Sequence, residues 1–377
     1  LMKPWLKKKN WNRADEILQW SRQVFVYKDS TYDTDYFDKM TLILNNNDSN
    51  FERIPLYGAI NTKKDEYWPT IYFDIRNNNK YLFFTRWNKK DEDIFISIYD
   101  NNTNKWSRGE RLKNLSKKNK NDAVFSVSHE GNKMVIFRSK FGNPDDSDLF
   151  ISTRTDIDWT NPVILPEPIN GPDAYEGGGF ITSDGEYFLF SSDRIGGIGP
   201  HIRKKGKEWG NQDIYVSADL GDNKWAEPIN LGNVINTKGA EITPYLSHDG
   251  LTLYFSSNDH PGLGGTDVFK STRTNKNKWT EWTIPINMGK YINTVENDEG
   301  YKLSPYENFA YFDSENDNGD KDIYKIQIDK NCVPEIKRVQ VKDLKDFPME
   351  GVKILAINPA TSDTINTGIT DTAGIAI

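Results

Sequence analysis

The sequence lacks several features that would assign it to a familiar class. It has one cysteine, Cys332, in 377 residues, so no disulfide can form within the chain. No apolar run approaches the roughly 20 residues that a membrane-spanning helix needs, and we expect no membrane span. The net charge is −7 and the pI is about 5.4, which argues against a broad basic face for nucleic acid. Disulfide-stapled, membrane-spanning and nucleic-acid-binding classes are therefore disfavoured.

Contiguous catalytic motifs are also missing. The sequence contains no H-E-x-x-H motif, no Cys/His cluster, no G-x-S-x-G elbow and no Walker loop. Gly-rich stretches such as "GLGGTD" are not followed by a helix that would present its N-terminus to a phosphate, so we assign their glycines to turns. His129 and His248 recur at the same point of a repeated turn, which favours an architectural role. We expect no catalytic residues, no metal site and no cofactor.

Aromatic residues, in contrast, are abundant at 13%, and they recur in phase. An Asp opens a "D-[IVL]-[FY]" element five times, at spacings of 55, 65, 54 and 55 residues. These residues are Asp93, Asp148, Asp213, Asp267 and Asp322. Three further landmarks keep step: Phe84, Phe137, Phe190, Phe255 and Phe312; Asn61, Asn170, Asn236 and Asn293; and Trp106, Trp159, Trp225 and Trp279.

Each repeat is typical of four short strands, because aromatic and β-branched runs alternate with Gly, Asp and Asn turns. Four-stranded units repeated around an axis predict an all-β, five-bladed β-propeller. The last repeat lacks its fourth strand, and residues 52–61 match the missing one. We therefore predict that residues 52–61 pair with residues 322–327 and close the ring, which removes two free edges. A sixth blade built from residues 25–50 is the alternative.

The flanks do not follow the repeat. Residues 1–50 are predicted to form a helical or irregular lead, since Trp11, Ala14, Ile17 and Leu18 have helical spacing. Residues 51–331 form the propeller. Residues 332–377 are predicted to form the start of a small β-sandwich.

Four stretches carry a resemblance to a known family: "YLFFTR", "SDGEYFLFSSDR", "KWAEPINLGNVINTKGAE" and "DGLTLYFSSNDHPGLGGTDVF". They resemble the WD40-like propeller repeats of Bacteroidetes OmpA-family envelope proteins, some of which serve type IX secretion. The tail resembles the opening of a carboxypeptidase regulatory-like domain. The resemblance implies a periplasmic or outer-membrane-associated protein that binds envelope or secretion-system proteins. Cell-wall association would come through an OmpA-like peptidoglycan-binding domain that is not in this sequence.

Charged residues provide two candidate binding sites. Glu66, Glu176, Glu241 and Glu299 each lie near the start of an innermost strand. Recurrence favours a structural role for them, and the alternative is an acidic rim around the channel that binds a cation or a basic partner. The insertion at residues 198–212 is the largest departure from the repeat, and partner binding tends to concentrate in such loops. Its candidate binding residues are Arg203, Lys204, Lys205, Lys207 and Trp209.

Two functions follow. The main prediction is a non-enzymatic binding scaffold of the periplasm, because polar residues are repeated and catalytic motifs are missing. The alternative is a carbohydrate-active or glycan-binding five-bladed propeller, which would need a non-repeated acid pair facing the channel beside aromatic platforms. Asp74, Glu92 and the many tryptophans keep that alternative open.

Overall fold

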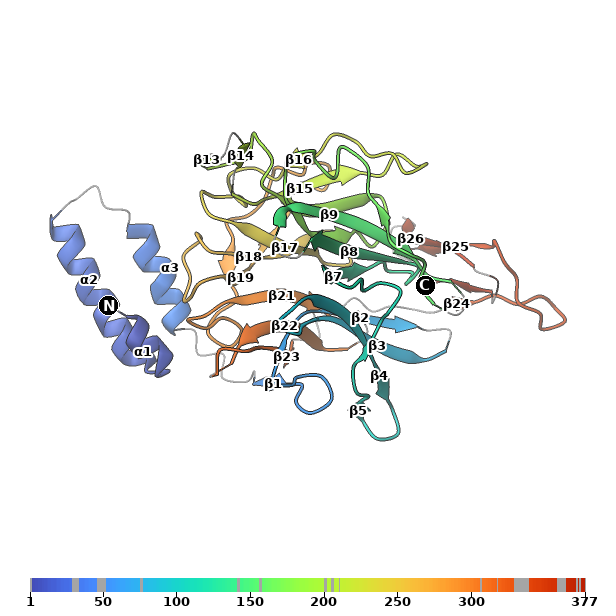
Figure 1. Ribbon diagram of the computed structural model, residues 1–377, viewed down its shortest axis with the longest axis horizontal. Coiled ribbons are helices and arrows are strands. Elements are labelled where there is room, and N and C mark those ends of the chain that lie inside the picture. The colour runs from blue at the N-terminus through green and yellow to red at the C-terminus, as the bar shows by residue number, and fades with distance from the viewer. Residues whose placement is uncertain are drawn as a thin grey trace.

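The computed structural model of the chain describes residues 2–28, 34–45, 52–74, 77–140, 143–155, 158–199, 202–204, 207–209, 211–305, 307–316, 318–328, 339–357, 364–370, 372 and 374–376. It shows a helical segment, a ring of five small antiparallel sheets and a small C-terminal β region (Figure 1). The fold is therefore the predicted five-bladed β-propeller with a helical lead.

The helical lead consists of α1 (Lys3–Lys7), α2 (Trp11–Lys28) and α3 (Thr34–Asn45). Its apolar stripe, which includes Ala14 and Leu18, packs together with Leu263 and Val295 of the propeller. Lys7 adds an ion pair with Glu296, with 2.6 Å between Nζ and Oε1. Among the described residues, no helix has the length and apolar character needed to cross a membrane.

The blades follow one another along the chain. Blade 1 contains β2 (Asp65–Asp74), β3 (Asn79–Trp87), β4 (Glu92–Asp100), β5 (Lys105–Trp106) and β6 (Glu110–Arg111). Blade 2 contains β7 (Lys120–Val127), β8 (Lys133–Lys140), β9 (Asn143–Thr153) and β10 (Val163–Ile164). Blade 3 contains β11 (Glu176–Ile181), β12 (Tyr187–Ser192), β15 (Asp213–Ala218) and β16 (Ile229–Asn230). Blade 4 contains β17 (Glu241–Leu246), β18 (Thr252–Ser257), β19 (Asp267–Thr272) and β20 (Ile286–Asn287). Blade 5 contains β21 (Asp298–Leu303), β22 (Phe309–Glu315), β23 (Lys321–Gln327) and the N-terminal strand β1 (Arg53–Pro55).

Ring closure by the N-terminal strand is confirmed. Strand β1 pairs antiparallel with β23, with Arg53 opposite Ile326. Asn61 strengthens the closure because its amide accepts from the backbone N–H of Ile323 and donates to the Ile323 carbonyl, both at 2.9 Å. A sixth blade from residues 25–50 does not form, since residues 34–45 are the helix α3.

The repeated asparagines all make this two-way clamp. Asn170, Asn236 and Asn293 hold the backbone N–H and carbonyl of Leu149, Ile214 and Val268 in the same way. Blade 1 uses the Ser116 hydroxyl instead, which accepts from the N–H of Ile94. Each clamp ties the loop that follows the outer strand to the third strand of the same blade, which explains the periodic asparagine.

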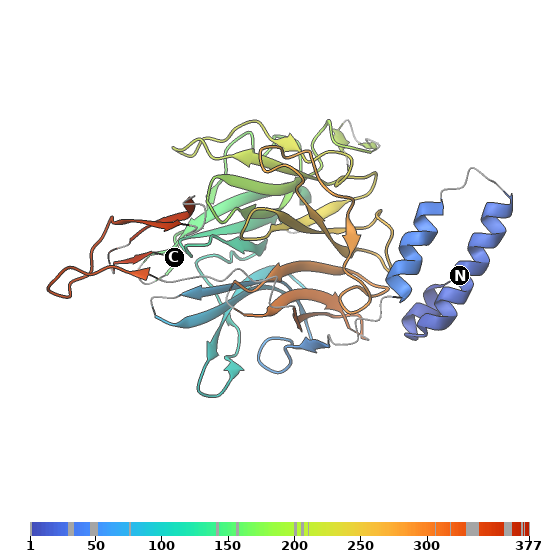
Figure 2. The same ribbon diagram turned by 180° about the vertical axis from the view of Figure 1, so that it is seen from behind.

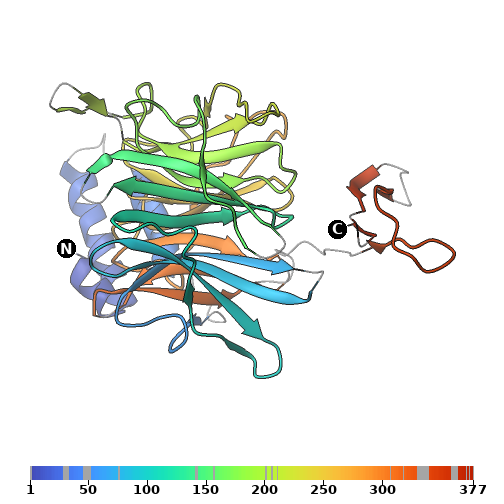
Figure 3. The same ribbon diagram turned by 45° about the vertical axis from the view of Figure 1, so that its right-hand side comes forward.

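The hydrophobic core lies between the blades. Each buried apolar cluster of the propeller combines side chains from two neighbouring blades, and the five clusters complete the circle. The inner strands contact one another in the order β2, β7, β11, β17, β21 and back to β2. They therefore surround the axis of the ring, and we call the region around this axis the channel. Figure 3 shows the ribbons of the blades beside one another.

Every inner strand contains a β-bulge, which lies two or three residues after the start of the strand in four blades and about five residues after it in β7. In four blades the bulge places a residue at positive φ: Trp68, Gly178, Thr243 and Gly300. Glycine adopts such angles without strain, whereas a bulky or β-branched side chain is strained there. Trp68 and Thr243 are therefore exceptional positions of the channel.

The C-terminal region forms two small sheets, in which β24 (Val339–Gln340) pairs with β27 (Ile375–Ala376), and β25 (Lys353–Ile357) pairs with β26 (Thr364–Ile369). This region and the helices lie on opposite sides of the propeller (Figure 2). The division of the chain at residues 50 and 331 stays a prediction.

Candidate functional site

The channel has two distinct ends. The residues that end the inner strands, including Val127, Ile181 and Leu303, converge around one cavity, which we call the C-terminal end of the channel. The residues that begin the inner strands lie at the opposite, N-terminal end. The predicted acidic rim belongs to the N-terminal end.

Three of the predicted rim residues are structural. Glu66, Glu176 and Glu241 are completely buried. Glu66 accepts from the Thr62 N–H at 2.9 Å and from Arg86 Nε at 2.6 Å. Glu241 accepts from the N–H and the hydroxyl of Thr237 and from the hydroxyl of Ser257 on the next strand, all at 2.7 Å. These carboxylates tie the loop before each inner strand to that strand, and they do not form an open acidic rim.

Glu299 occupies a different position from the other three. In blade 5 the structural carboxylate is Asp298, which accepts the Thr294 N–H at 2.6 Å, and in blade 2 it is Asp122. Glu299 lies one residue later, opposite Asp313 of β22. Because neighbouring residues of a strand face opposite sides of the sheet, Glu299 points away from the structural position. The prediction that Glu299 belongs to the repeated set was wrong.

Glu299 instead belongs to a group of ionisable side chains that is not part of the repeated pattern. Lys321 Nζ lies 3.0 Å from Glu299 Oε2 and 3.8 Å from Asp313 Oδ2. Lys302, also buried, donates to the Pro69 carbonyl at 2.9 Å. Asp313 itself is completely buried. Blades 5 and 1 thus bring charged groups together at their junction, which we call the charged junction.

Glu92 of β4 extends this cluster toward blade 1. The Tyr67 hydroxyl donates a hydrogen bond to its carboxylate, and the charge of Lys321 acts on it. Burial raises the pKa of Glu92 above its usual range, and the Asp122 charge adds to the rise, against the Tyr67 hydrogen bond and Lys321. A carboxyl with a raised pKa keeps its proton nearer to neutral pH, as a general acid must.

Aromatic rings flank the charged junction. The Trp68 ring packs on Tyr67 and Phe125, with ring centroids 4.9 Å and 4.6 Å apart. Tyr175 of blade 3 packs on Phe137, and its pKa is raised by burial and by the charges of Glu92 and other nearby carboxylates. Three blades therefore supply aromatic side chains beside the acids.

Trp68 is strained at this place. Its φ is 51°, where the equivalent residues of blades 3 and 5 are glycines. Its N–H donates to Asp313 Oδ1 at 2.9 Å, which holds the strained backbone. Its indole N–H is buried and has no hydrogen-bond partner among the described residues. Strain and unpartnered buried donors concentrate at functional sites.

The other predicted residues lie elsewhere. Asp74 ends β2 and pairs with Arg154 at 3.2 Å, so it is outside the charged junction. The basic insertion forms a hairpin of β13 (Ile202–Lys204) and β14 (Lys207–Trp209), in which Arg203 lies opposite Glu208. Lys205 lies outside the described residues. Binding by Arg203, Lys204, Lys205, Lys207 and Trp209 stays a prediction.

The sequence analysis gave the two turn histidines an architectural role and did not foresee that they would meet. His129 and His248 belong to blades 2 and 4, yet their rings meet at the C-terminal end of the channel, with centroids 4.5 Å apart. Their shared turn position was the available signal, because equivalent turns of a propeller surround the same axis. Within the described part of the chain, no three His, Cys, Asp or Glu side chains gather to hold a metal ion.

No family model matches the chain, and no curated protein matches it. Solved structures share its fold. One described as a glycoside hydrolase has a TM-score of 0.52 at 9% identity, over 76% of this chain and 94% of the hydrolase. The catalytic domain of a GH62 α-L-arabinofuranosidase from Coprinopsis cinerea has a TM-score of 0.48 at 11% identity, over 74% and 96%. An endo-arabinase from Bacteroides thetaiotaomicron has a TM-score of 0.48 at 14% identity, over 78% and 99%. The likeness to the first of these structures, at 9% identity, establishes the propeller fold alone.

The comparison contradicts the prediction of a non-enzymatic binding scaffold. A structure described as a glycoside hydrolase shares the fold over three quarters of this chain, and the findings favour the alternative, a carbohydrate-active or glycan-binding propeller. The same likeness contradicts the expectation that the chain is not an enzyme, although at 9% identity it shows the fold alone. A search for contiguous motifs misses a glycosidase, whose two carboxylates need only be near in space. The resemblance to WD40-like envelope proteins, the periplasmic or outer-membrane-associated location and the envelope or secretion-system partners stay predictions.

Proposed function

We propose that the protein binds and hydrolyses a glycan at the N-terminal end of the channel. The observation that carries this proposal is the charged junction, in which the non-repeated acids Glu92 and Glu299 lie beside Tyr67, Trp68 and Tyr175. Glycoside hydrolysis needs one carboxyl that protonates the leaving oxygen and a second carboxylate, held at a fixed separation. Aromatic rings supply the apolar faces on which sugar rings pack.

Within this proposal the two acids have different roles. Glu92 is the proton donor, because burial raises its pKa and the Tyr67 hydroxyl orients it. Glu299 is the second carboxylate, ion-paired with Lys321 at 3.0 Å. Asp313 is completely buried and accepts from the backbone of Trp68, so it positions the tryptophan and does not touch the sugar.

The test separates hydrolysis from binding. The purified chain is incubated with a panel of neutral and acidic oligosaccharides, products are followed by anion-exchange chromatography, and binding is measured by calorimetry. Glu92→Gln should lower kcat about 100-fold or more and leave binding within threefold, because general acid catalysis contributes roughly 10²–10⁴-fold. The exposed Glu227→Gln is the matched control and should keep full activity.

Binding has its own variants. Trp68→Ala and Tyr175→Ala should each weaken glycan affinity about tenfold, because each removes an aromatic anchor. If the parent chain binds a glycan but does not cleave it, and these variants lose the binding, the glycan-binding part of the proposal stands and hydrolysis is refuted. A parent chain that neither binds nor cleaves any member of the panel would overturn the whole proposal.

A further inference from the structure

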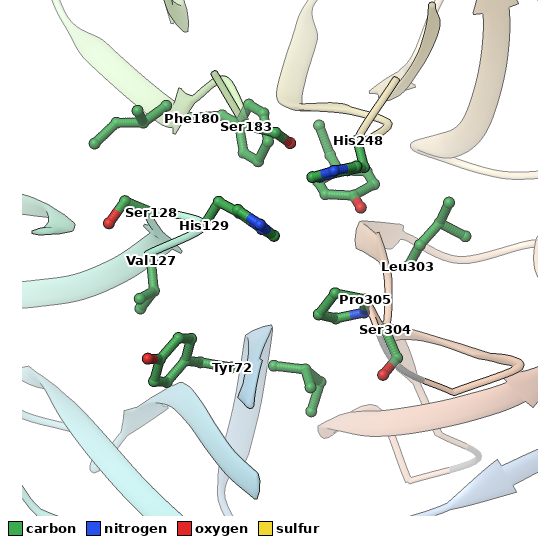
Figure 4. A pocket seen from close by; sticks show the side chains of 13 residues that line it. Tyr72, Val127, Ser128, His129, Phe180, Ser183, His248, Leu303, Ser304 and Pro305 are labelled. Carbon is green, nitrogen blue, oxygen red and sulfur yellow. The ribbon is translucent and has the colours of Figure 1, made fainter. Parts of the chain in front are cut away.

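The C-terminal end of the channel holds a cavity of about 70 Å³ into which His129 and His248 point (Figure 4). The two rings come from blades 2 and 4, which are not neighbours. Their centroids lie 4.5 Å apart, and their planes make an angle of 49°. This end of the channel is distinct from the charged junction, where the inner strands begin.

The fold brings the two rings together through equivalent turns. The turns after the inner strands of blades 2 to 5 place His129, Ser183, His248 and Pro305 at the same position around the cavity. Blade 3 lies between the two histidine-bearing blades, and at this turn position it has the small Ser183. A bulky residue there would separate the imidazoles, so a serine at this position lets them meet.

The turns themselves are fixed. The Ser128 hydroxyl accepts from the Lys133 N–H at 3.0 Å, and the Ser247 hydroxyl accepts from the Thr252 N–H at 2.8 Å. Each serine directly precedes its histidine, so the start of each turn is anchored to the next strand. Side chains on anchored turns lose little further freedom when they bind a ligand.

Burial disfavours the protonated, charged form of both imidazoles. Burial, together with the charge of His248, lowers the pKa of His129 to about 4. Burial also lowers the pKa of His248, against the opposing charges of Asp249 and Asp184. No hydrogen bond to a described residue contributes to either shift. Each neutral ring therefore keeps a nitrogen lone pair that can bind a cation without first releasing a proton.

The ring separation suits a shared metal ion. An imidazole nitrogen binds Zn²⁺ at about 2.0–2.1 Å, which places the ring centroid about 3.2 Å from the ion. Two such rings at the tetrahedral angle of about 109° around one ion have centroids about 5.2 Å apart. The observed separation of 4.5 Å is close to this, so a small rotation of the two side chains brings both rings to one ion. The cavity also has room for water, whose share of liquid volume is about 30 Å³. Nearby Asp184 and Asp249 add negative charge that favours a cation.

We infer that His129 and His248 form a two-imidazole site for a divalent ion of borderline softness, such as Zn²⁺, completed by the Ser183 hydroxyl and water. Such a site pins blade 2 to blade 4 across the axis. It is independent of the proposed activity on glycans. With two protein ligands, its affinity should be in the micromolar range, well below that of a four-ligand structural zinc site.

Calorimetry with ZnCl₂ on the EDTA-treated, dialysed chain tests the inference. One ion should bind per chain, and the melting temperature should rise with Zn²⁺ concentration. His129→Asn and His248→Asn should each weaken Zn²⁺ binding at least tenfold. His260→Asn and His201→Asn are controls for the other two histidines, and both should bind Zn²⁺ as the parent does.

A spectroscopic measurement on the parent chain avoids any dependence on variant folding. Electron paramagnetic resonance of bound Cu²⁺ should show coupling to two imidazole nitrogens. No saturable binding of Zn²⁺, or binding that survives the double His129→Asn/His248→Asn change and is lost in His201→Asn, would overturn the inference. A Cu²⁺ spectrum with fewer than two nitrogen ligands would do the same.

Discussion

The junction between blades 5 and 1 and the junction between blades 4 and 5 use the same strand positions for different chemistry. The positions of Glu299 and Asp313 in blade 5 are occupied by Ile242 and Ser256 in blade 4. The bulge position holds Thr243 and Gly300 at the junction of blades 4 and 5, and it holds Gly300 and the strained Trp68 at the charged junction.

This difference shows what the architecture requires. Both junctions fold with the same bulge and the same strand pairing, so the propeller tolerates either a neutral or a charged channel wall. Burying charge is costly unless each charge is paired, and the charged junction contributes nothing to the fold that Ile242 and Ser256 do not supply. Charged residues retained at such cost are candidates for function.

The largest effect should come from removing Asp313. Asp313→Ala takes the acceptor from the Trp68 N–H and leaves buried Lys302 without its neighbouring anion, so we expect a loss of about 3–5 kcal/mol in the free energy of unfolding. Ser256→Ala, at the equivalent position, loses one hydroxyl contact with Thr243 and should cost about 1 kcal/mol. Urea unfolding at pH 7 measures both.

Equal costs at the two positions would break the comparison between the junctions. Asp313→Asn keeps an acceptor for Trp68 and serves as the milder variant if Asp313→Ala does not fold. The loss in the free energy of unfolding caused by Asp313→Asn should fall between the losses caused by Asp313→Ala and Ser256→Ala.

The next effect concerns ring closure. Asn61→Ala and Asn236→Ala each remove a two-way clamp and leave a buried N–H unpaired, at a cost of about 1–3 kcal/mol, while the clamped carbonyl keeps its bond from the N–H of Leu56 or Leu231. Of these two asparagines, only Asn61 joins the N-terminal and C-terminal ends of the propeller ring, where β1 pairs with β23. Hydrogen exchange should therefore accelerate in β1 and β23 in the Asn61 variant, whereas the Asn236 variant should accelerate exchange within blade 3. Unchanged exchange at Ile323 in the Asn61 variant would contradict the closing role.

Two glycines give a smaller contrast. A Cβ on Gly264 would lie 2.5 Å from the Thr294 carbonyl oxygen and would also meet the Glu296 carbonyl, so this glycine permits a close backbone approach and does not serve turn geometry alone. Gly250 has φ +71° and open space around it. Gly264→Ala should cost about 2–3 kcal/mol, and Gly250→Ala about 1 kcal/mol from backbone strain. Thermal unfolding distinguishes them, and the reverse order would refute the packing argument.

The smallest effect is a pH dependence. Burial raises the pKa of Glu241 to about 7, against its hydrogen bonds. Because the folded pKa is raised, the stability that this group contributes is complete below about pH 4.5 and is lost as the pH rises through 7. Relative to Glu241→Gln, the parent should therefore lose about 1–3 kcal/mol between pH 4.5 and pH 8.

Glu66→Gln is the matched variant in blade 1. Glu66 occupies the same position and is paired with Arg86, so its removal should destabilise the chain at every pH tested, because Arg86 loses its buried anion. Urea unfolding at pH 4.5, 6 and 8 gives both comparisons. Parallel curves for the parent and Glu241→Gln would contradict the raised pKa.

Local sequence was sufficient for the architecture. Blade number, strand order and closure by residues 52–61 followed from the periodic Asp, Asn and aromatic residues, because each blade repeats one set of short-range contacts. Asn236 and Asp267 serve the blade that contains them, so their spacing alone exposed their structural role. At two positions the repeat read from the sequence was wrong by one residue. The structural carboxylate of blade 5 is Asp298 and not Glu299, and the residue of blade 2 equivalent to Phe84 is Ile136 and not Phe137.

The sites, however, were decided only by the tertiary structure. Glu92 and Glu299 are separated by most of the propeller in sequence, and both interact with Lys321 only because blade 5 closes against blade 1. His129 and His248 meet only because the ring brings equivalent turns of two blades to one axis, with a serine between them. A repeat reveals what every blade shares, since local contacts recur with the sequence. What differs between blades acquires its meaning across the channel, where the distances are set by the closed ring.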